Sequence, residues 1–218
     1  MKPDLAWGAE CAWPALRVAP TRSWAWKSLA LGLFLIGALQ FGHGTWIQAK
    51  GWLAQELIAR AWLRTLDGGK EVKPWPWADT WPVARLLAPA LGIERYVLAG
   101  ANGIAFGPGH FSGTPVPGAP GNSVVGGHRD THLAFLRNVK PGDLLQVERA
   151  DGEQVPYRVL DASVLDKRDL WVAKQEGPNR LTLVTCYPFD APRAGGTQRY
   201  VVFAFESRNR GGERGTRG

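Results

Sequence analysis

The chain has 218 residues, enough for one ordinary domain with short additional segments, and its formal charge is +7. Two cysteines are too few for a disulfide framework, and neither they nor the four histidines show the spacing of a metal site, so we expect no metal and no other cofactor. The basic excess gathers near the two termini rather than in a stripe among stacking aromatics, which argues against a nucleic-acid partner.

Residues 28–49 form an apolar segment without a charged side chain, and Lys27 and Lys50 bracket it. About 20 such residues span the hydrocarbon core of a bilayer as a helix, and tryptophans on both sides suit the two interfaces. We therefore expect a leader over residues 1–27 and a transmembrane anchor over residues 28–49 that contacts membrane lipid. A cleaved signal peptide is the competing interpretation.

Residues 50–78 are predicted to form a stalk and a linker. Apolar residues recur near helical spacing as far as Gly68, which favours a short amphipathic helix. The proline- and tryptophan-rich residues 74–77 then favour a stiff, extended linker. The folded domain is expected to begin near Asp79.

Residues 79–206 have the pattern of a β-rich domain. Glycine and proline clusters separate short β-type runs, which favours a small barrel or a sandwich, and the pair Asp151-Gly152 between two runs predicts a hairpin. Residues 207–218 are rich in glycine and arginine and are expected to form a disordered tail. The predicted strands are residues 95–98, 123–127, 144–148, 155–164, 181–185 and 199–205.

Cys186 stands at the end of a predicted strand, where the chain enters a loop. A lone cysteine is usually a buried structural residue, so a chemical role depends on its neighbours. A nearby imidazole or guanidinium favours the thiolate, which is the nucleophilic form. His128, at the end of another predicted strand, could supply the imidazole, and His110 and His132 are the alternatives.

Two further residues could complete such a site. Arg199, at the start of the last predicted strand, stays cationic and could direct its N–H donors at a developing oxyanion. Asp130 could orient His128. The other interpretation is that Asp130 or Thr131 is the N-cap of a short helix predicted over residues 131–139.

Taken together, these residues resemble the sortase family. Residues 182–186, Thr-Leu-Val-Thr-Cys, match that family's TLxTC motif, and Arg199 stands where the family has its catalytic arginine. Residues 127–131, Gly-His-Arg-Asp-Thr, look like the catalytic-histidine segment, and residues 117–122, Pro-Gly-x-x-Gly-Asn, precede it. The resemblance covers residues 82–205. It implies a mainly β fold, a closed eight-stranded sortase-type β-barrel with short helices, preceded by an N-terminal transmembrane helix.

The resemblance also implies a reaction, cysteine transpeptidation at a C-terminal sorting signal similar to LPxTG in a protein substrate. Cys186 would form a thioester, His128 would protonate the leaving amine and deprotonate the incoming one, and Arg199 would hold the oxyanion. The amine acceptor is not identified by the sequence. The residues expected to support the site or to bind substrate are Thr185, Tyr187, Asp130 and Asn122.

The segments Gly-His-Arg-Asp-Thr and Thr-Cys-Tyr-Pro-Phe look most like the sortase branch of Gram-negative proteobacteria. This implies a single-pass protein of the inner membrane, with residues 1–27 in the cytoplasm and the catalytic domain in the periplasm. Two rival functions use the same features: a cysteine peptidase or hydrolase with the same site, and a membrane-anchored β-barrel that binds a peptide without catalysis.

Overall fold

The computed structural model of the protein describes residues 23–100, 102–193 and 195–207. Most of the predicted leader, with Cys11, and nearly all of the predicted tail lie outside the described residues. The chain divides into two compact units, residues 1–48 and residues 49–218.

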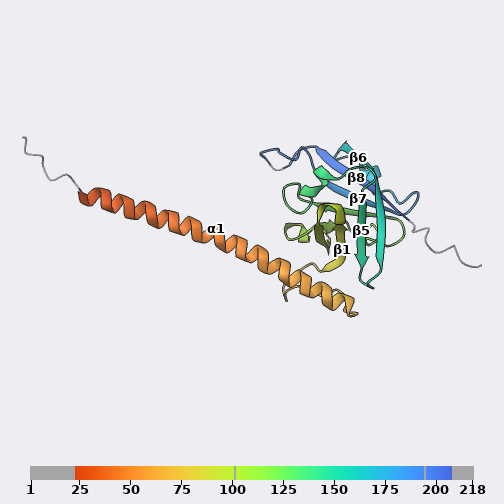
Figure 1. The fold of residues 1–218 in the computed structure, drawn as a ribbon, viewed down its shortest axis with the longest axis horizontal. Coiled ribbons are helices and arrows are strands. Elements are labelled where there is room, and N and C mark those ends of the chain that lie inside the picture. Colours follow the sequence, from red (N-terminus) through yellow and green to blue (C-terminus); the bar gives the residue numbers. More distant parts are fainter. Residues whose placement is uncertain (1–22, 101, 194, 208–218) are drawn as a thin grey trace, which may run out of the picture. The chain divides into compact units, whose positions relative to one another are not determined.

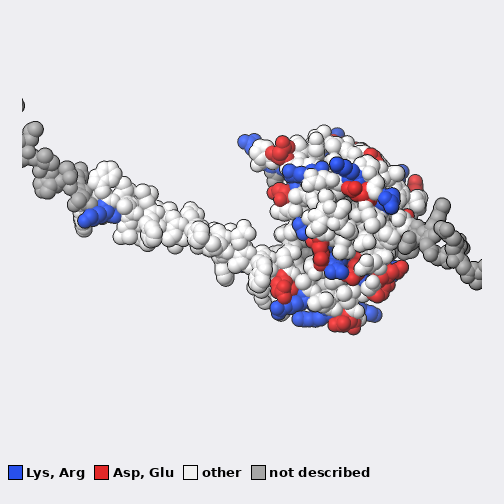
Figure 2. Space-filling model, in the orientation of Figure 1, with Lys and Arg blue, Asp and Glu red and all other residues white. Residues whose placement is uncertain are grey.

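One helix, α1, spans Ser23–Leu66 (Figure 1), so the predicted anchor and the predicted stalk are parts of one continuous helix. No charged residue stands between Lys27 and Lys50, and Figure 2 shows this stretch of the helix as an unbroken white surface. By length and composition α1 is long and apolar enough to cross a membrane, a test that a signal sequence also passes. Just after the helix, Gly68 has a φ of 95°, the left-handed backbone that glycine adopts most readily at a helix end.

The second unit contains a closed barrel in which eight strands follow the order β1-β2-β3-β4-β7-β8-β6-β5 (Figure 1). This confirms the predicted fold class. Most neighbouring strands are antiparallel, whereas β4 pairs in parallel with β7 and β2 with β3. The strands are β1 (Pro82–Ala88), β2 (Ile93–Ala99), β3 (Gly109–His110), β4 (Asn122–Gly127), β5 (Leu144–Arg149), β6 (Gln154–Asp166), β7 (Arg180–Cys186) and β8 (Gln198–Glu206). The 3-10 helices are η1 (Pro89–Leu91), η2 (Asn102–Ala105), η3 (Ala134–Asn138) and η4 (Leu170–Ala173).

Every strand predicted from the sequence is present within slightly wider bounds. The hairpin between β5 and β6 turns at Gly152, whose φ is 81° and whose amide donates to the carbonyl oxygen of Arg149 at 2.9 Å. Two strands, β1 and β3, are not among the predicted strands. β3 has two residues, which are too few to show a β-type alternation.

The short helix predicted over residues 131–139 is present, but its bounds and its cap differ from the prediction. The chain instead makes turns after β4 and then the 3-10 helix η3, whose N-cap is Leu133 without a side-chain hydrogen bond. The reason lies in the core, because Leu133 is fully buried in it. The chain must insert this side chain before it can begin a helix, so neither Asp130 nor Thr131 is the cap.

Side chains from the strands and from η3 fill the barrel core, and burial alternates along β1 as expected for a strand with one face inward. The last turns of α1 pack on the outside of the barrel in the second unit. Ile58 and Trp62 are each 1% exposed. Trp62 Nε1 donates to Glu148 Oε2 at 3.1 Å, and the same oxygen lies 2.7 Å from Arg85 Nε. This part of α1 therefore packs within the second unit.

Candidate active site

The register between β7 and β8 places Cys186 directly opposite Arg199. Along β7, Leu183 and Thr185 are buried toward the barrel interior, so the alternation of a strand turns Val184 and Cys186 to the outer face. Directly paired residues of neighbouring strands share a face, so Cys186 and Arg199 occupy paired positions on the outer face of the barrel.

The parallel pairing of β4 with β7 brings the segment of residues 127–131, which contains His128, to the same edge. Its last registered pair is Gly127 with Thr185, and the next residues along the two strands are His128 and Cys186. The hydroxyl of Thr185 donates to the carbonyl oxygen of Gly127 at 2.8 Å, which fixes the two strand ends together. The topology therefore brings together the three residues that the sequence predicted.

These three side chains are open to a ligand. His128 is exposed, and Cys186 and Arg199 are partly buried. Cys186 is a free thiol. Arg199 donates from Nη1 to the carbonyl oxygens of Gly196 and Gln198, at 3.1 and 2.8 Å. The other two guanidinium nitrogens have no hydrogen-bond partner among the described residues. The arrangement can hold a carbonyl group between a nucleophile and several N–H donors.

The other two histidines are engaged elsewhere. His110, on β3, is buried, and its Nε2 lies 2.9 Å from the carbonyl oxygen of Thr114. His132 Nε2 lies 3.2 Å from the carbonyl oxygen of Ala105. Burial lowers the pKa of His132, and the nearby charges of Arg95 and His128 lower it further. The register with Cys186 therefore singles out His128 among the three candidates.

Tyr187 follows the cysteine and joins an aromatic cluster at the start of the β7/β8 loop. Its ring stacks on Tyr200 with centroids 6.2 Å apart and meets Phe189 edge-on at 6.1 Å. Its amide donates to the carbonyl oxygen of Gln198 at 3.1 Å, so this amide is occupied by the strand ladder. Tyr187 thus shapes the loop beside the cysteine.

Asn122, at the start of β4, is 1% exposed and holds the β6/β7 loop against the barrel. Its Nδ2 donates to the carbonyl oxygens of Val172 and Lys174, at 2.8 and 3.1 Å, and its Oδ1 accepts from the Thr182 hydroxyl at 2.7 Å. Thr182 lies two residues before Val184 on the outer face of β7. Asn122 therefore fixes the loop that covers the face on which Cys186 lies.

Asp130 is exposed, and its side chain has no hydrogen bond within the described ranges. Its neighbour Arg129, which the sequence did not single out, is 7% exposed and bonds two carbonyl groups of the β7/β8 loop. The sequence gives no signal for the burial of Arg129, because a run of histidine, arginine and aspartate is typical of an exposed turn.

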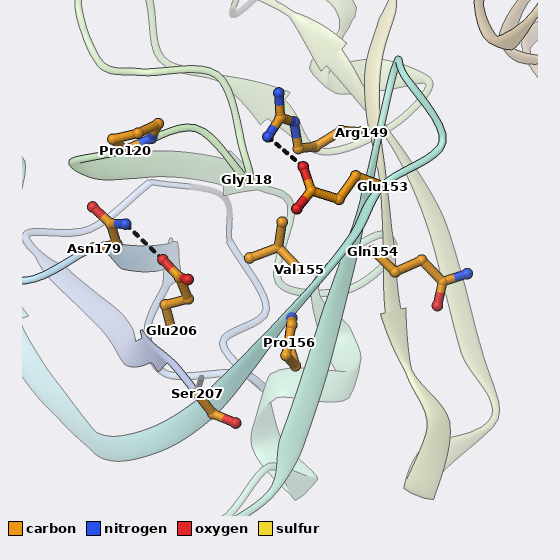
Figure 3. Close-up of a pocket in the computed structure, with 10 residues that line it drawn as sticks. All are labelled: Gly118, Pro120, Arg149, Glu153, Gln154, Val155, Pro156, Asn179, Glu206 and Ser207. Atoms are coloured by element: carbon orange, nitrogen blue, oxygen red, sulfur yellow. Dashed lines mark hydrogen bonds and ion pairs between the residues drawn. The ribbon is translucent and has the colours of Figure 1, made fainter. Parts of the chain in front are cut away.

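A pocket of about 440 Å³ lies at the other end of the barrel strands (Figure 3). Its lining includes Asn179, just before β7, and Glu206, at the end of β8, whereas Cys186 ends β7 and Arg199 is near the start of β8. Its charged groups are satisfied internally, since Glu206 accepts from Asn179 and Glu153 pairs with an arginine. This pocket is separate from the candidate active site. Among the described residues, no group of three or more His, Cys, Asp or Glu side chains could hold a metal ion.

Comparison with known proteins identifies the family. The family model described as the sortase domain matches residues 86–207, more than half of the chain. The chain belongs to the sortase family. Sortases are cysteine transpeptidases that act on protein substrates with sorting signals, and the matched residues include Cys186, His128 and Arg199.

Individual sortases agree with this assignment. Sortase D of Bacillus subtilis (strain 168) is 30% identical over 122 residues, which are 53% of this chain and 59% of that protein. Sortase A from Corynebacterium diphtheriae superposes with a TM-score of 0.54 at 24% identity, over 68% of this chain and 70% of that chain. A sortase D5 transpeptidase from Clostridium perfringens gives a TM-score of 0.51 at 22% identity, over 68% and 88% of the two chains. The two structural matches show that the fold is that of sortases.

Proposed function

We propose that this sortase is a membrane-anchored cysteine transpeptidase that cleaves an LPxTG-like signal near the C-terminus of a protein substrate and transfers the acyl fragment to an amine. The observation that carries the proposal is the strand register, which pairs Cys186 with Arg199 and sets Gly127, the residue before His128, beside Thr185. Three chemically matched residues from distant parts of the chain thereby belong to neighbouring strand ends, which supports the proposal.

In the first half of the reaction, the Cys186 thiolate attacks the carbonyl carbon of the scissile peptide bond. A bond forms between sulfur and carbon, and negative charge develops on the carbonyl oxygen, where the Arg199 guanidinium stabilises it. The carbon–nitrogen bond then breaks, and imidazolium His128 gives its proton to the departing amine. The acyl fragment remains on sulfur as a thioester.

In the second half, an incoming amine attacks the thioester carbon. Neutral His128 accepts the proton that the amine loses, the new carbon–nitrogen bond forms, and sulfur leaves as thiolate. Thr185 holds the ends of β4 and β7 together through its hydrogen bond to Gly127. Asn122 and Tyr187 shape the two neighbouring loops, and Asp130 lies exposed beside the histidine.

We also propose that residues 28–49 anchor the chain in the inner membrane of a Gram-negative proteobacterium, with residues 1–27 in the cytoplasm. Residues 50–78 would form the stalk and linker, residues 79–206 would form the catalytic domain in the periplasm, and residues 207–218 would form a tail. The length and apolar composition of α1 support the anchor, and the packing of Trp62 on Glu148 supports a stalk close to the catalytic domain.

The test is a transfer reaction with the full chain in detergent micelles and an LPxTG-like peptide, with and without an added amine, followed by mass spectrometry. We expect a thioester on Cys186, release of the C-terminal fragment and formation of the amide. Cys186→Ala should abolish the thioester, and His128→Ala or Arg199→Ala should lower the rate by at least about a hundredfold.

Two outcomes would contradict transpeptidation. Product that is entirely acid, even with amine in excess, would identify a cysteine hydrolase with the same site. A peptide that binds without cleavage in both wild type and Cys186→Ala would identify a peptide-binding barrel.

A further inference from the structure

We propose that Arg129 is a positioning residue that holds the β7/β8 loop against the histidine segment and so sets the separation of His128 from Cys186. This inference deepens the proposed transpeptidase function and rests on it. It concerns a residue that touches neither substrate nor the reacting atoms.

Arg129 lies in the turn after β4, and its side chain reaches the β7/β8 loop. It is 7% exposed, and its Nη2 donates to two carbonyl oxygens of the β7/β8 loop, those of Ala191 at 3.0 Å and Arg193 at 2.6 Å. One guanidinium thus binds two points of a loop more than 60 residues further along the chain.

The partners of Arg129 are unusual for a buried cation. In the described part of the chain it forms no ion pair, and its Nη1 is buried without a hydrogen-bond partner. Burial of a charge without a compensating carboxylate costs free energy, and an apolar side chain of similar size is often at least as stable in such a place. Stability alone is therefore a poor explanation for an arginine at this position. The need for a donor to two loop carbonyls is a more specific explanation.

A second contact joins the same two segments. The guanidinium carbon of Arg137, in η3, lies 5.0 Å from the centre of the Phe189 ring, and Phe189 packs edge-on against Tyr200 at 5.1 Å. The β7/β8 loop is thus held from the side of η3 as well. Arg129 and Arg137 both belong to the chain segment that follows β4, so the loop and this segment form one packed unit.

The position of Arg129 connects this packing to the candidate active site. The loop begins after Cys186 and ends before Arg199, and Arg129 is the neighbour of His128. A loop that moves away from Arg129 therefore moves the cysteine and arginine ends of β7 and β8 relative to the imidazole. Displacements of about 1 Å between reacting groups can cost about a hundredfold in rate.

The experiment compares wild type with Arg129→Met and Arg129→Lys, each as the full chain in detergent. Two controls separate positioning from stability. Arg158→Met removes an exposed guanidinium–carbonyl bond, to Gly142 at 2.8 Å, and Val147→Ala opens the core in β5, which pairs with β1 and β6. The readouts are hydrogen–deuterium exchange of residues 187–193, the thermal midpoint, and kcat and KM for an LPxTG-like peptide.

We expect Arg129→Met to speed exchange of residues 187–193 at least about tenfold and to lower kcat at least about tenfold, with a smaller change in KM. Arg129→Lys should recover part of both effects, because an ammonium group can still donate to one of the two carbonyls. Arg158→Met should leave the exchange of residues 187–193 and kcat unchanged. Val147→Ala should lower the thermal midpoint without changing the exchange of the loop.

Unchanged loop exchange in Arg129→Met would overturn the inference, as would an equal fall of kcat in Val147→Ala at a matched thermal midpoint. If wild type cleaves no peptide, the proposed function fails, and the exchange data still decide whether Arg129 holds the loop.

Discussion

Cys186 acquires its chemical meaning from the residues paired with it across two strands. A thiol at the end of a strand is compatible with a structural role, since cysteine is often buried as a small hydrophobic residue. Here the thiol is partly exposed on the outer face of β7, opposite a guanidinium and next to the end of the strand that leads to an imidazole. The same three groups at other register positions would have no common chemistry.

Tyr157 provides a pH-dependent stability test. It is fully buried; burial raises its pKa to about 12, and the charge of Glu206 adds to this. An unfolded tyrosine titrates near about 10. Between pH 10 and 12 the unfolded chain loses this proton while the folded protein keeps it, so the free energy of unfolding falls with pH, by up to about 1.4 kcal/mol per pH unit. Below pH 10 the contribution is fully present.

The measurement is urea unfolding from pH 8 to 11.5 for wild type and Tyr157→Phe. We expect the wild type to lose stability more steeply above pH 10, because phenylalanine has no proton to lose. Parallel curves would show that the Tyr157 phenol titrates alike in both states. Other tyrosines remain in both proteins, so their effects cancel in the comparison.

Trp62 is a second residue with a definite energetic role. Its Nε1 donates to the buried Glu148 carboxylate, and its ring lies 6.5 Å from that of Tyr96. Trp62→Phe removes the donor and leaves part of the space empty, so the free energy of unfolding should fall by about 1–3 kcal/mol. Trp52→Phe on the same helix, where the side chain is 72% exposed, should change it by less than about 0.5 kcal/mol. Equal effects in thermal unfolding followed by circular dichroism would contradict this role.

Among the elements, the β6/β7 loop depends on one amide side chain. The Asn122 side chain donates to two carbonyl groups of this loop, those of Val172 and Lys174. It also accepts a hydrogen bond from the Thr182 hydroxyl. The loop carries Trp171, whose ring stacks on Phe203 of β8 with centroids 5.7 Å apart. The polar contacts and the stack together fix this loop on the face that bears the cysteine.

Asn122→Ala should therefore destabilise the protein and loosen this loop. Several buried polar groups would lose their partner, which we expect to lower the free energy of unfolding by about 2–3 kcal/mol. Proteolysis within residues 167–179 should become faster under conditions in which the rest of the chain stays folded. Asn138→Ala, at an exposed position in η3, is the matched control. Unchanged cleavage within the loop would show that Asn122 does not hold it.

For the whole molecule, the packing of the end of α1 on the barrel bears on where the folded domain begins. The sequence pattern placed this boundary near Asp79, after the linker. In the second unit, however, residues 54–65 of α1 bury Ile58, Ala61 and Trp62 against the barrel. A domain that begins at Asp79 would expose the surface that these side chains cover.

We therefore expect a chain of residues 79–218 to melt about 10 °C below a chain of residues 49–218. The lost burial of three apolar side chains amounts to several kcal/mol, and each kcal/mol shifts the midpoint of a domain of this size by about 2–8 °C. Trp62→Phe in the longer chain should fall between the two. Equal midpoints in calorimetry would show that the end of α1 contributes nothing to the domain.

Local sequence determined which residues form strands and where the cysteine stands. Short runs of β-type residues between glycine and proline clusters defined six of the strands, and the pair Asp151-Gly152 defined the hairpin. The resemblance to sortases rested on three short segments and one arginine. Local preferences erred in the cap and the bounds of the short helix within residues 131–139, where the buried Leu133 is the N-cap.

Only the tertiary structure decided which strand ends lie together and which residues hold the loops. The resemblance to sortases indicated His128 among three histidines, and the parallel pairing of β4 with β7 places it next to the strand end that carries Cys186. The burial of Arg129 and of Asn122 depends in the same way on loops 50 or more residues distant. Two parallel strands are joined by a long crossover, and no turn motif in the sequence marks their register. These contacts therefore follow from closure of the barrel and not from any local pattern.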